Sequence, residues 1–418
     1  MRGAQILLAT IALLIMAPPG LGDEAPTLRR IVVTGQPVPG GGEFDRFGIE
    51  SLPVVAPVNS RGHVAFFATV ARGTATEGIF LAADGRITRI AAEGDRVPGA
   101  GTISGFGRHP TPGMSESGAV AFAAAVAGGK TVEGIFASSR SRLRTVAVAG
   151  QPAPDVPSGT LAALDAPALN DQGDIAFLAS VRRGRETVEA IYLHSRGKLR
   201  KLVGQGEPAP AGGVFAGFGP PVLNNRGLVA FGAVVEGRAV PGGVFLWDGK
   251  QVRMLVGAGD EAPLGGVFAK FSERVALNDA GAVAFTSVLK NAPAAAGVFA
   301  VENARLRTVA ALGAAAPGGG TFSYFGLWPA LSTAGVVAFT ASVDGGTSPV
   351  GVFVVGAAGS RRVAGVGDRL PDGARLATLT LYPAVSMSAA GDVTFAAAPS
   401  ATGEGVEGIF LAAAPRPH

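Results

Sequence analysis

The chain contains no cysteine, and only 16% of its 418 residues are charged. Without cysteine it forms no disulfide and has no thiolate to act as a nucleophile or metal ligand. Its formal net charge is +4, and the basic residues are scattered along the sequence. Because nucleic-acid binding depends on clustered positive charge, we expect no nucleic-acid partner. Phosphate-binding, dinucleotide-binding and nucleophile-elbow motifs are also missing from any strand-to-helix context, and no cofactor is expected.

Long hydrophobic runs are missing beyond the N-terminus, so we expect no membrane span in the mature chain. The first residues contain Arg2, an apolar run over residues 6–17, and small residues at Gly20 and Gly22. This order is typical of a secretory signal peptide. We predict a signal peptide over residues 1–22 and export to the periplasm or the extracellular space, a retained anchor being the alternative.

Glycine and proline are abundant, with 63 and 29 residues, and hydrophobic residues make up 48% of the chain. Turn-forming residues in this number favour short strands over helices, and no segment of the mature chain has helical periodicity. The apolar content is high enough to build a core. The composition therefore indicates an all-β protein.

One motif recurs seven times: Asn or Ser, two residues, Gly, two residues, and then Ala-Phe in most copies. Its glycines follow one another at intervals of 54 to 56 residues: Gly62, Gly118, Gly173, Gly227, Gly281, Gly335 and Gly391. The Asn or Ser oxygen can accept a backbone N–H bond within its turn, and glycine adopts the left-handed conformation that the turn needs. The apolar residues that follow predict a strand buried on both faces.

Two further patterns separate consecutive copies of this motif. A Gly-Ile/Val-Phe segment, as at residues 78–80, and a tight turn predict a hairpin that leads to another strand. A loop with Gly, a polar residue, two variable residues and Pro then follows, as at residues 94–98. Each repeat of about 55 residues thus contains four short strands. Seven such repeats predict a seven-bladed β-propeller with four-stranded blades.

The two ends of the chain supply incomplete repeats. Residues 28–34 match a fourth strand with no repeat before them, and residues 408–411 match a third strand with none after them. Pairing of these strands would complete the seventh blade and remove an open sheet edge. We therefore predict one propeller over residues 23–418, with its ring closed by the terminal strands.

The chain resembles a bacterial exported tandem-repeat family named for its Asn-x-x-Gly-x-x-Ala-Phe motif. All seven copies carry the glycine, six carry Ala-Phe and four carry Asn, so the resemblance covers the whole mature chain. The turn and strand are also similar to those of TolB-type propellers. Both resemblances imply a propeller, and neither implies an activity because the repeat family is largely uncharacterised. Many members have a C-terminal Pro-Glu-Pro sorting tail, which this sequence lacks, so secretion is expected rather than surface anchoring.

The polar position of the Gly-to-Pro loop carries a carboxylate in four repeats: Asp95, Glu207, Asp260 and Asp368. Equivalent loops of a propeller lie on one face, so these are the side chains that a bound cation would use. The interpretation that we favour, because the position repeats, is that each side chain accepts backbone N–H bonds in its own loop. We accordingly predict no metal site.

Residues near the start of the first strand of each repeat break the symmetry. They place polar and aromatic side chains at the expected mouth of the central channel: Glu50, Arg108, His109, Asp165, Glu273, Arg274, Trp328 and Tyr382. Variable side chains on a rigid scaffold are typical of a ligand site. Trp328 and Tyr382 would offer flat faces to a sugar, and neutral drift at exposed positions is the alternative interpretation.

The leading hypothesis is a secreted, monomeric, non-catalytic propeller that binds a small molecule, glycan, peptide or protein of the cell surface. A propeller hydrolase or lyase using His109, Asp165 and Glu273 is the first alternative. Two carboxylates about 5–10 Å apart would favour it, since glycoside hydrolysis uses that separation. A purely structural surface or matrix component is the second alternative.

Overall fold

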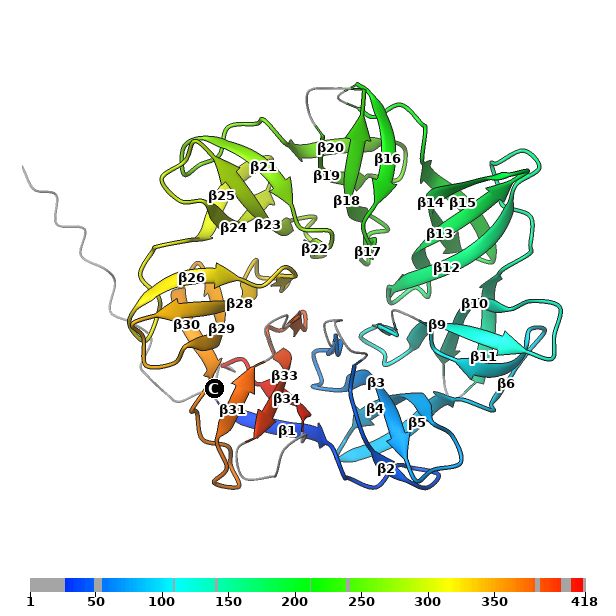
Figure 1. Cartoon of the computed structure of the whole chain (residues 1–418), viewed down its shortest axis with the longest axis horizontal. Coiled ribbons are helices and arrows are strands. Elements are labelled where there is room, and N and C mark those ends of the chain that lie inside the picture. The colour runs from blue at the N-terminus through cyan, green and yellow to red at the C-terminus, as the bar shows by residue number, and fades with distance from the viewer. Residues whose placement is uncertain are drawn as a thin grey trace, which may run out of the picture.

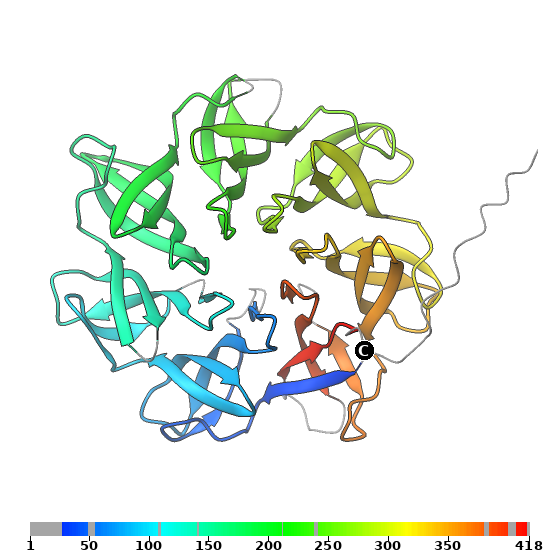
Figure 2. The ribbon, with the colours of Figure 1, turned by 180° about the vertical axis from the view of Figure 1, so that it is seen from behind.

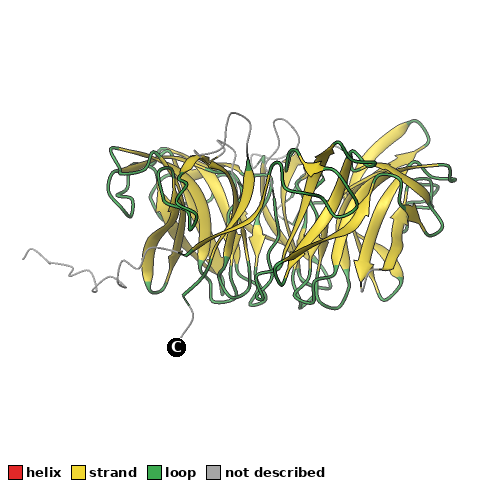
Figure 3. Cartoon of the chain, turned by 90° about the horizontal axis from the view of Figure 1, so that it is seen from below, coloured by secondary structure: helices red, strands yellow, loops and turns green. Residues whose placement is uncertain are grey.

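The computed structural model describes residues 27–48, 55–107, 110–139, 142–210, 212–237, 241–379, 384–399 and 407–415. These residues form β-strands and loops, with no helix among them. Seven antiparallel sheets surround a central opening (Figure 1), and the view from behind shows the same closed ring (Figure 2). Seen from the side, the ring is a flat disc with loops on both faces (Figure 3). The predicted seven-bladed β-propeller is confirmed.

The first four blades lie between residues 43 and 257. The first blade contains β2 (Glu43–Phe44), β3 (Val64–Ala71), β4 (Glu77–Ala83) and β5 (Arg86–Ala92). The second contains β6 (Arg96–Val97), β7 (Gly101–Gly105), β8 (Gly113–Met114), β9 (Val120–Ala127), β10 (Glu133–Ser139) and β11 (Arg142–Val148). The third contains β12 (Thr160–Leu169), β13 (Ile175–Arg183), β14 (Glu186–Ser195) and β15 (Lys198–Gly204). The fourth contains β16 (Val214–Phe218), β17 (Val222–Leu223), β18 (Val229–Glu236), β19 (Gly242–Trp247) and β20 (Val252–Gly257).

The remaining blades follow the same order. The fifth contains β21 (Val267–Phe271), β22 (Ala276–Leu277), β23 (Val283–Lys290), β24 (Ala296–Glu302) and β25 (Arg305–Ala311). The sixth contains β26 (Thr321–Phe325), β27 (Ala330–Leu331), β28 (Val337–Asp344), β29 (Val350–Gly356) and β30 (Gly359–Gly365). The seventh contains β31 (Leu376–Leu379), β32 (Ser386–Met387), β33 (Val393–Pro399), β34 (Gly408–Ala412) and β1 (Leu28–Val33).

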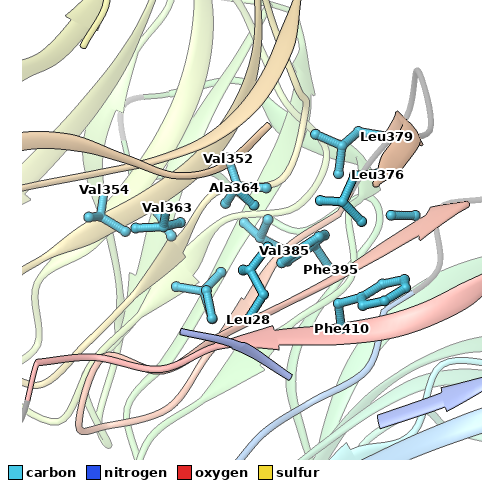
Figure 4. Close-up of a cluster of buried hydrophobic side chains, with 14 of the residues drawn as sticks. Leu28, Val352, Val354, Val363, Ala364, Leu376, Leu379, Val385, Phe395 and Phe410 are labelled. Carbon is cyan, nitrogen blue, oxygen red and sulfur yellow. The ribbon is translucent and has the colours of Figure 1, made fainter. Parts of the chain in front are cut away.

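The ring closes as the sequence predicts. β1 pairs antiparallel with β34, with Leu28 opposite Ala412 and Val33 opposite Gly408. The side chain of Leu28 is buried in one cluster with Phe395 of β33 and Phe410 of β34 (Figure 4). The first and last strands of the described chain therefore share one sheet and one core.

The first strand of most blades is divided, which the sequence analysis did not predict. β16 and β17 both pair with β18, and the register shifts between Phe215 and Gly217. The segment between the two strands contains Pro220 and Pro221, which have no N–H to donate to a sheet. The bend carries the second part of the strand toward the axis, where β17 and β22 lie nearest the central opening (Figure 1).

Adjacent blades share their apolar faces. One cluster joins Ala284 and Val298 of the fifth blade to Phe322, Phe339 and Phe353 of the sixth. Because each sheet is too thin to bury its own faces, the core of this protein consists of such layers between neighbouring blades. No helix of the described segments is long and apolar enough to cross a membrane.

Candidate functional site: the central channel

The wall of the channel is formed by the recurring turns that the sequence analysis identified. In the fourth blade, Asn224 Oδ1 accepts the N–H of Arg226 at 3.0 Å and that of Leu228 at 2.9 Å. The turn glycine, Gly227, has a φ of 77°, in the left-handed region. The prediction that the Asn side chain and the Gly conformation build this turn is confirmed.

The Asn side chains also connect neighbouring blades, which the sequence analysis missed. Asn170 Nδ2 donates to the carbonyl of Asn224 at 3.2 Å, and Asn224 Nδ2 to that of Asn278 at 2.8 Å. Asn278 Nδ2 continues the series to the carbonyl of Ser332 at 2.9 Å. We call these bonds, together with those of the residues that follow each Asn or Ser, the turn belt. The sequence feature that could have indicated these bonds is Asn at a constant spacing of 54 residues in consecutive repeats.

Asn224 variants test the turn belt. Asn224→Ala removes two acceptor bonds and one donor bond at a buried site, so we expect it to lower the free energy of unfolding by about 1–3 kcal/mol. Asn224→Ser keeps a hydroxyl that can accept the N–H of Leu228, as in the natural copies at Ser115 and Ser332, and loses the bond from Arg226 and the bond between blades. Urea unfolding should place Asn224→Ser between the wild type and Asn224→Ala. A stability of Asn224→Ser equal to that of the wild type would contradict an inter-blade role.

The residue after each Asn or Ser adds a second set of inter-blade bonds. Asp171 Oδ1 accepts the N–H of Glu116 at 2.7 Å, and Asp279 Oδ1 accepts that of Asn225 at 2.8 Å. Asn225 Nδ2 lies between the two aspartates and donates to Oδ2 of each, at 2.8 and 3.0 Å. Glu116 accepts in turn from the N–H and the hydroxyl of Ser60, at 2.8 and 3.2 Å. The acidic side chains of the turn belt therefore have their acceptors occupied.

The turns and the short strands before them enclose a channel cavity of about 270 Å³. Its lining includes the belt residues Glu116, Asp171 and Asp279, and also Arg274 and Trp328. The last two residues were predicted from their departure from the repeat. In the channel, the recurring turns and two symmetry-breaking side chains therefore line the same cavity.

Arg274 and Trp328 occupy equivalent positions in adjacent blades, each seven residues before its turn glycine. The residues at this position in all seven repeats are Val55, Thr111, Ala166, Pro220, Arg274, Trp328 and Ala384. The guanidinium carbon of Arg274 lies 5.3 Å from the centroid of the Trp328 ring, a cation–π contact. Burial in the channel wall lowers the pKa of Arg274 to about 10, because removal from water disfavours its charged form.

The other predicted site residues are placed differently. Asp165 lies in β12, where its Oδ1 accepts the N–H of Ala166 at 2.7 Å. Glu273 is exposed, and its carbonyl oxygen faces Gly219, where an added Cβ would lie only 1.9 Å away. Neither Asp165 nor Glu273 is among the described residues that line the channel cavity. The candidates Glu50, Arg108, His109 and Tyr382 lie outside the described residues.

Three of the four carboxylates of the Gly-to-Pro loops accept a hydrogen bond from their own backbone. Asp95, Glu207 and Asp260 accept the N–H of the residue three positions earlier, at 2.8, 3.0 and 2.7 Å. Asp368 instead accepts two hydrogen bonds from Arg362 at 2.9 Å. Throughout the described segments, no group of three or more His, Cys, Asp or Glu side chains is close enough to hold a metal ion.

Glutamates at the start of the third strand connect neighbouring blades. Glu77 Oε1 accepts the N–H of Phe106, and Glu133 Oε1 accepts that of Leu164, both at 2.8 Å. Burial raises the pKa of both carboxyls, and the negative charge of Asp165 adds to the effect at Glu133. These side chains position the first strand of the next blade, which leads to the channel.

The raised pKa of Glu133 predicts a pH dependence of stability. Because the folded protein binds this proton more tightly than the unfolded chain, the stabilisation is fully present below the usual pKa of 4.5. It is lost as the pH rises through the higher folded value. Glu133→Gln keeps an acceptor for Leu164 and does not titrate, so we expect the wild type to gain stability relative to this variant between pH 7 and pH 4. Paired urea titrations at the two pH values measure the difference, and a constant or opposite difference would contradict the account.

Comparison with protein families assigns the chain by sequence. The model of a family of unknown function, DUF7453, matches residues 21–300 and 277–415. The chain belongs to this family. The two matches of DUF7453 overlap over residues 277–300 and together include the described residues of all seven blades. This match does not establish the Asn-x-x-Gly-x-x-Ala-Phe repeat family that the sequence resembles.

Similarity of this DUF7453 member to proteins of known function is distant. No curated protein matches the chain. An oligogalacturonate lyase in complex with manganese is 13% identical, with 94% of this chain and 98% of that chain covered at a TM-score of 0.48. A puromycin-hydrolysing peptidase of Mycobacterium tuberculosis is 13% identical, with 88% and 53% covered at a TM-score of 0.49. A six-bladed Aleuria aurantia lectin is 11% identical, with 79% and 98% covered at a TM-score of 0.37. Similarities at this level carry no argument about ligand or activity.

Proposed function

We propose that the protein is an exported, non-catalytic propeller that binds a carbohydrate, a peptide or a surface component at one mouth of its central channel. The observation that carries the proposal is the pairing of Arg274 with Trp328 in the channel wall. The equivalent residues of the other blades are small or apolar, or threonine, whereas these two provide a cation and an aromatic ring. Rigid strands on either side hold the pair in place, as a binding site needs.

Export, and membership of the Asn-x-x-Gly-x-x-Ala-Phe repeat family, are parts of the same proposal. The order of charge, apolar run and small residues over residues 1–22 supports cleavage of a signal peptide, which N-terminal sequencing of the secreted protein would test. The recurrence of the Asn-x-x-Gly-x-x-Ala-Phe motif supports a place among the exported repeat proteins that carry it.

A matched pair of tryptophan variants tests the binding function. The chain has two tryptophans, and Trp247 lies under Arg200 at a position outside the channel lining. On a glycan and peptide array, we expect Trp328→Ala to weaken binding of the ligand by tenfold or more, because aromatic contacts dominate such sites. Trp247→Ala should bind as the wild type does, provided that its melting curve shows a folded protein. Equal binding by wild type and Trp328→Ala would exclude the channel mouth as the site.

A further inference from the structure

Within the described part of the chain, the guanidinium group of Arg274 has no hydrogen-bond acceptor. It carries five N–H donors, and its contact with the ring of Trp328 satisfies none of them in the plane of the group. Among the described residues, no carboxylate forms an ion pair with it, although Glu273 is its neighbour in sequence. The side chain is half-buried and lines the channel cavity, so an anion that enters the channel can reach its unpaired donors.

Three other half-buried arginines have acceptors, whereas Arg361, whose pKa burial also lowers, has none among the described residues. Arg144 donates to the carbonyl of Gly173 at 3.2 Å, Arg307 to that of Gly335 at 3.0 Å, and Arg362 to the carboxylate of Asp368. Arg200 makes the same kind of contact with a tryptophan as Arg274 does, with 5.5 Å between its guanidinium carbon and the Trp247 centroid. Arg200 is exposed, however, so water can accept its hydrogen bonds. Arg274 combines the tryptophan contact with a position in the channel wall.

The acidic residues of the channel do not compensate Arg274. Asp171, Asp279 and Glu116 already accept hydrogen bonds within the turn belt. Asp279 is also five residues further along the extended chain than Arg274, which corresponds to roughly 16 Å at the rise of a strand. Interactions between exposed charges over more than about 8 Å are largely screened at physiological ionic strength. Among the described lining residues, Arg274 therefore stands apart from the acidic side chains of the turn belt.

We infer that Arg274 binds an oxyanionic group of the ligand, a carboxylate, sulfate or phosphate, at the end of the channel away from the turn belt. The planar guanidinium group of Arg274 can donate to two oxygens of the anion at once. The contact with Trp328 holds the Arg274 side chain over the face of the indole ring. The acidic turn belt at the other end repels a second anion, so the ligand enters with its anionic group toward Arg274. This inference rests on the proposed function, since it concerns the same mouth of the channel.

The test is calorimetric titration of the mature protein with acetate, sulfate and phosphate, at constant ionic strength in chloride. We expect saturable binding of at least one of these anions with an affinity near the millimolar range, which is the scale for ligands of so few atoms. Arg274→Ala should weaken that binding tenfold or more, as the loss of charge-assisted hydrogen bonds predicts. Arg200→Ala, which removes an arginine from the other tryptophan, should stay within twofold of the wild type. The order of the three anions shows which oxyanion the site prefers.

Two outcomes would overturn the inference: no saturable binding of any of the anions by the wild type, or equal binding by the wild type and Arg274→Ala. If Arg274→Ala does not fold, as its melting curve will show, Arg274→Lys decides the question. It keeps the charge and loses the fork, so binding weakened severalfold supports the inference and unchanged binding contradicts it. The array separates the anion site from the proposed function. A neutral ligand that Trp328→Ala no longer binds and Arg274→Ala still binds would support the proposed function and contradict only the anion site.

Discussion

A chain that begins at Thr34, and so lacks β1, is expected to lose about 3–6 kcal/mol of unfolding free energy. The deletion removes the side chains of Leu28 and Val32, which are 3% and 0% exposed. Burial of each is worth about 1.5–3 kcal/mol. It also leaves β34 as an open edge in the seventh blade, and open edges promote association between molecules. We therefore expect light scattering on heating in addition to a lower urea midpoint.

The matched control for this truncation is a chain that begins at Thr27. Both chains lack residues 1–26, and only the control keeps β1. Any difference in stability between the two proteins is therefore due to the closing strand. Equal urea midpoints for the two chains would mean that the pairing of β1 with β34 contributes nothing to stability.

Truncation of Phe285 is expected to have the second large effect. This ring is 0% exposed, and its centroid lies 5.9, 5.5 and 5.8 Å from those of Phe268, Phe271 and Phe299. Phe285→Ala should cost about 3–5 kcal/mol, from the lost transfer energy and the cavity. Urea unfolding of the variant, with an unchanged slope, measures the loss.

Phe395 provides a comparison at the equivalent position of the seventh blade. It is 2% exposed and, among the described residues, has one aromatic neighbour, Phe410 at 5.9 Å. Because each aromatic pair adds roughly 0.5–1.5 kcal/mol beyond the area that it buries, Phe395→Ala should cost less than Phe285→Ala by about 1–3 kcal/mol. The reverse order would show that the ring clusters do not decide the stability of a blade.

The features predicted correctly from the sequence are those that depend on residues within a single repeat. Asn224 and Gly227 specify their turn by side-chain chemistry and backbone conformation, and the seven spacings then fix the number of blades. The pairing of β1 with β34 followed from two incomplete repeats at the chain ends. Local patterns of this kind carry enough information because they describe contacts within one unit.

Contacts between blades were the features that the sequence did not reveal. The bond from Asn224 to Asn278 and the bond from Arg307 to Gly335 each depend on the rotation that relates one blade to the next. A recurring Arg in the fourth strand was visible, at Arg144, Arg200, Arg253, Arg307 and Arg361 among others. Its partner was not, since it belongs to another repeat.

The candidate site was predicted in part for a related reason. Arg274 and Trp328 were recognised because they break the symmetry, and they do line the channel. Asp165 and Glu273 stand one position earlier in their repeats, eight residues before the turn glycine. The lining of the fifth blade begins at Arg274 and continues through every residue to Asp279, so a shift of one position places Glu273 just outside it. Composition alone does not fix that register.

Closure of the ring by the two ends of the chain is the claim on which the channel and its site depend. Leu28 and Ala412 are opposed in the pairing of β1 with β34, and directly opposed residues of an antiparallel pair have Cα atoms about 4.5–5.5 Å apart, within reach of a disulfide. The natural chain has no cysteine, so a Leu28→Cys/Ala412→Cys variant can form only the designed bond. We predict that mild oxidation joins these residues, seen as a mobility shift on a non-reducing gel, and that Arg29→Cys/Ala412→Cys, with one side chain on the other face, does not react. Failure of the first pair to form, or equal formation by both pairs, would contradict the closed seven-bladed ring.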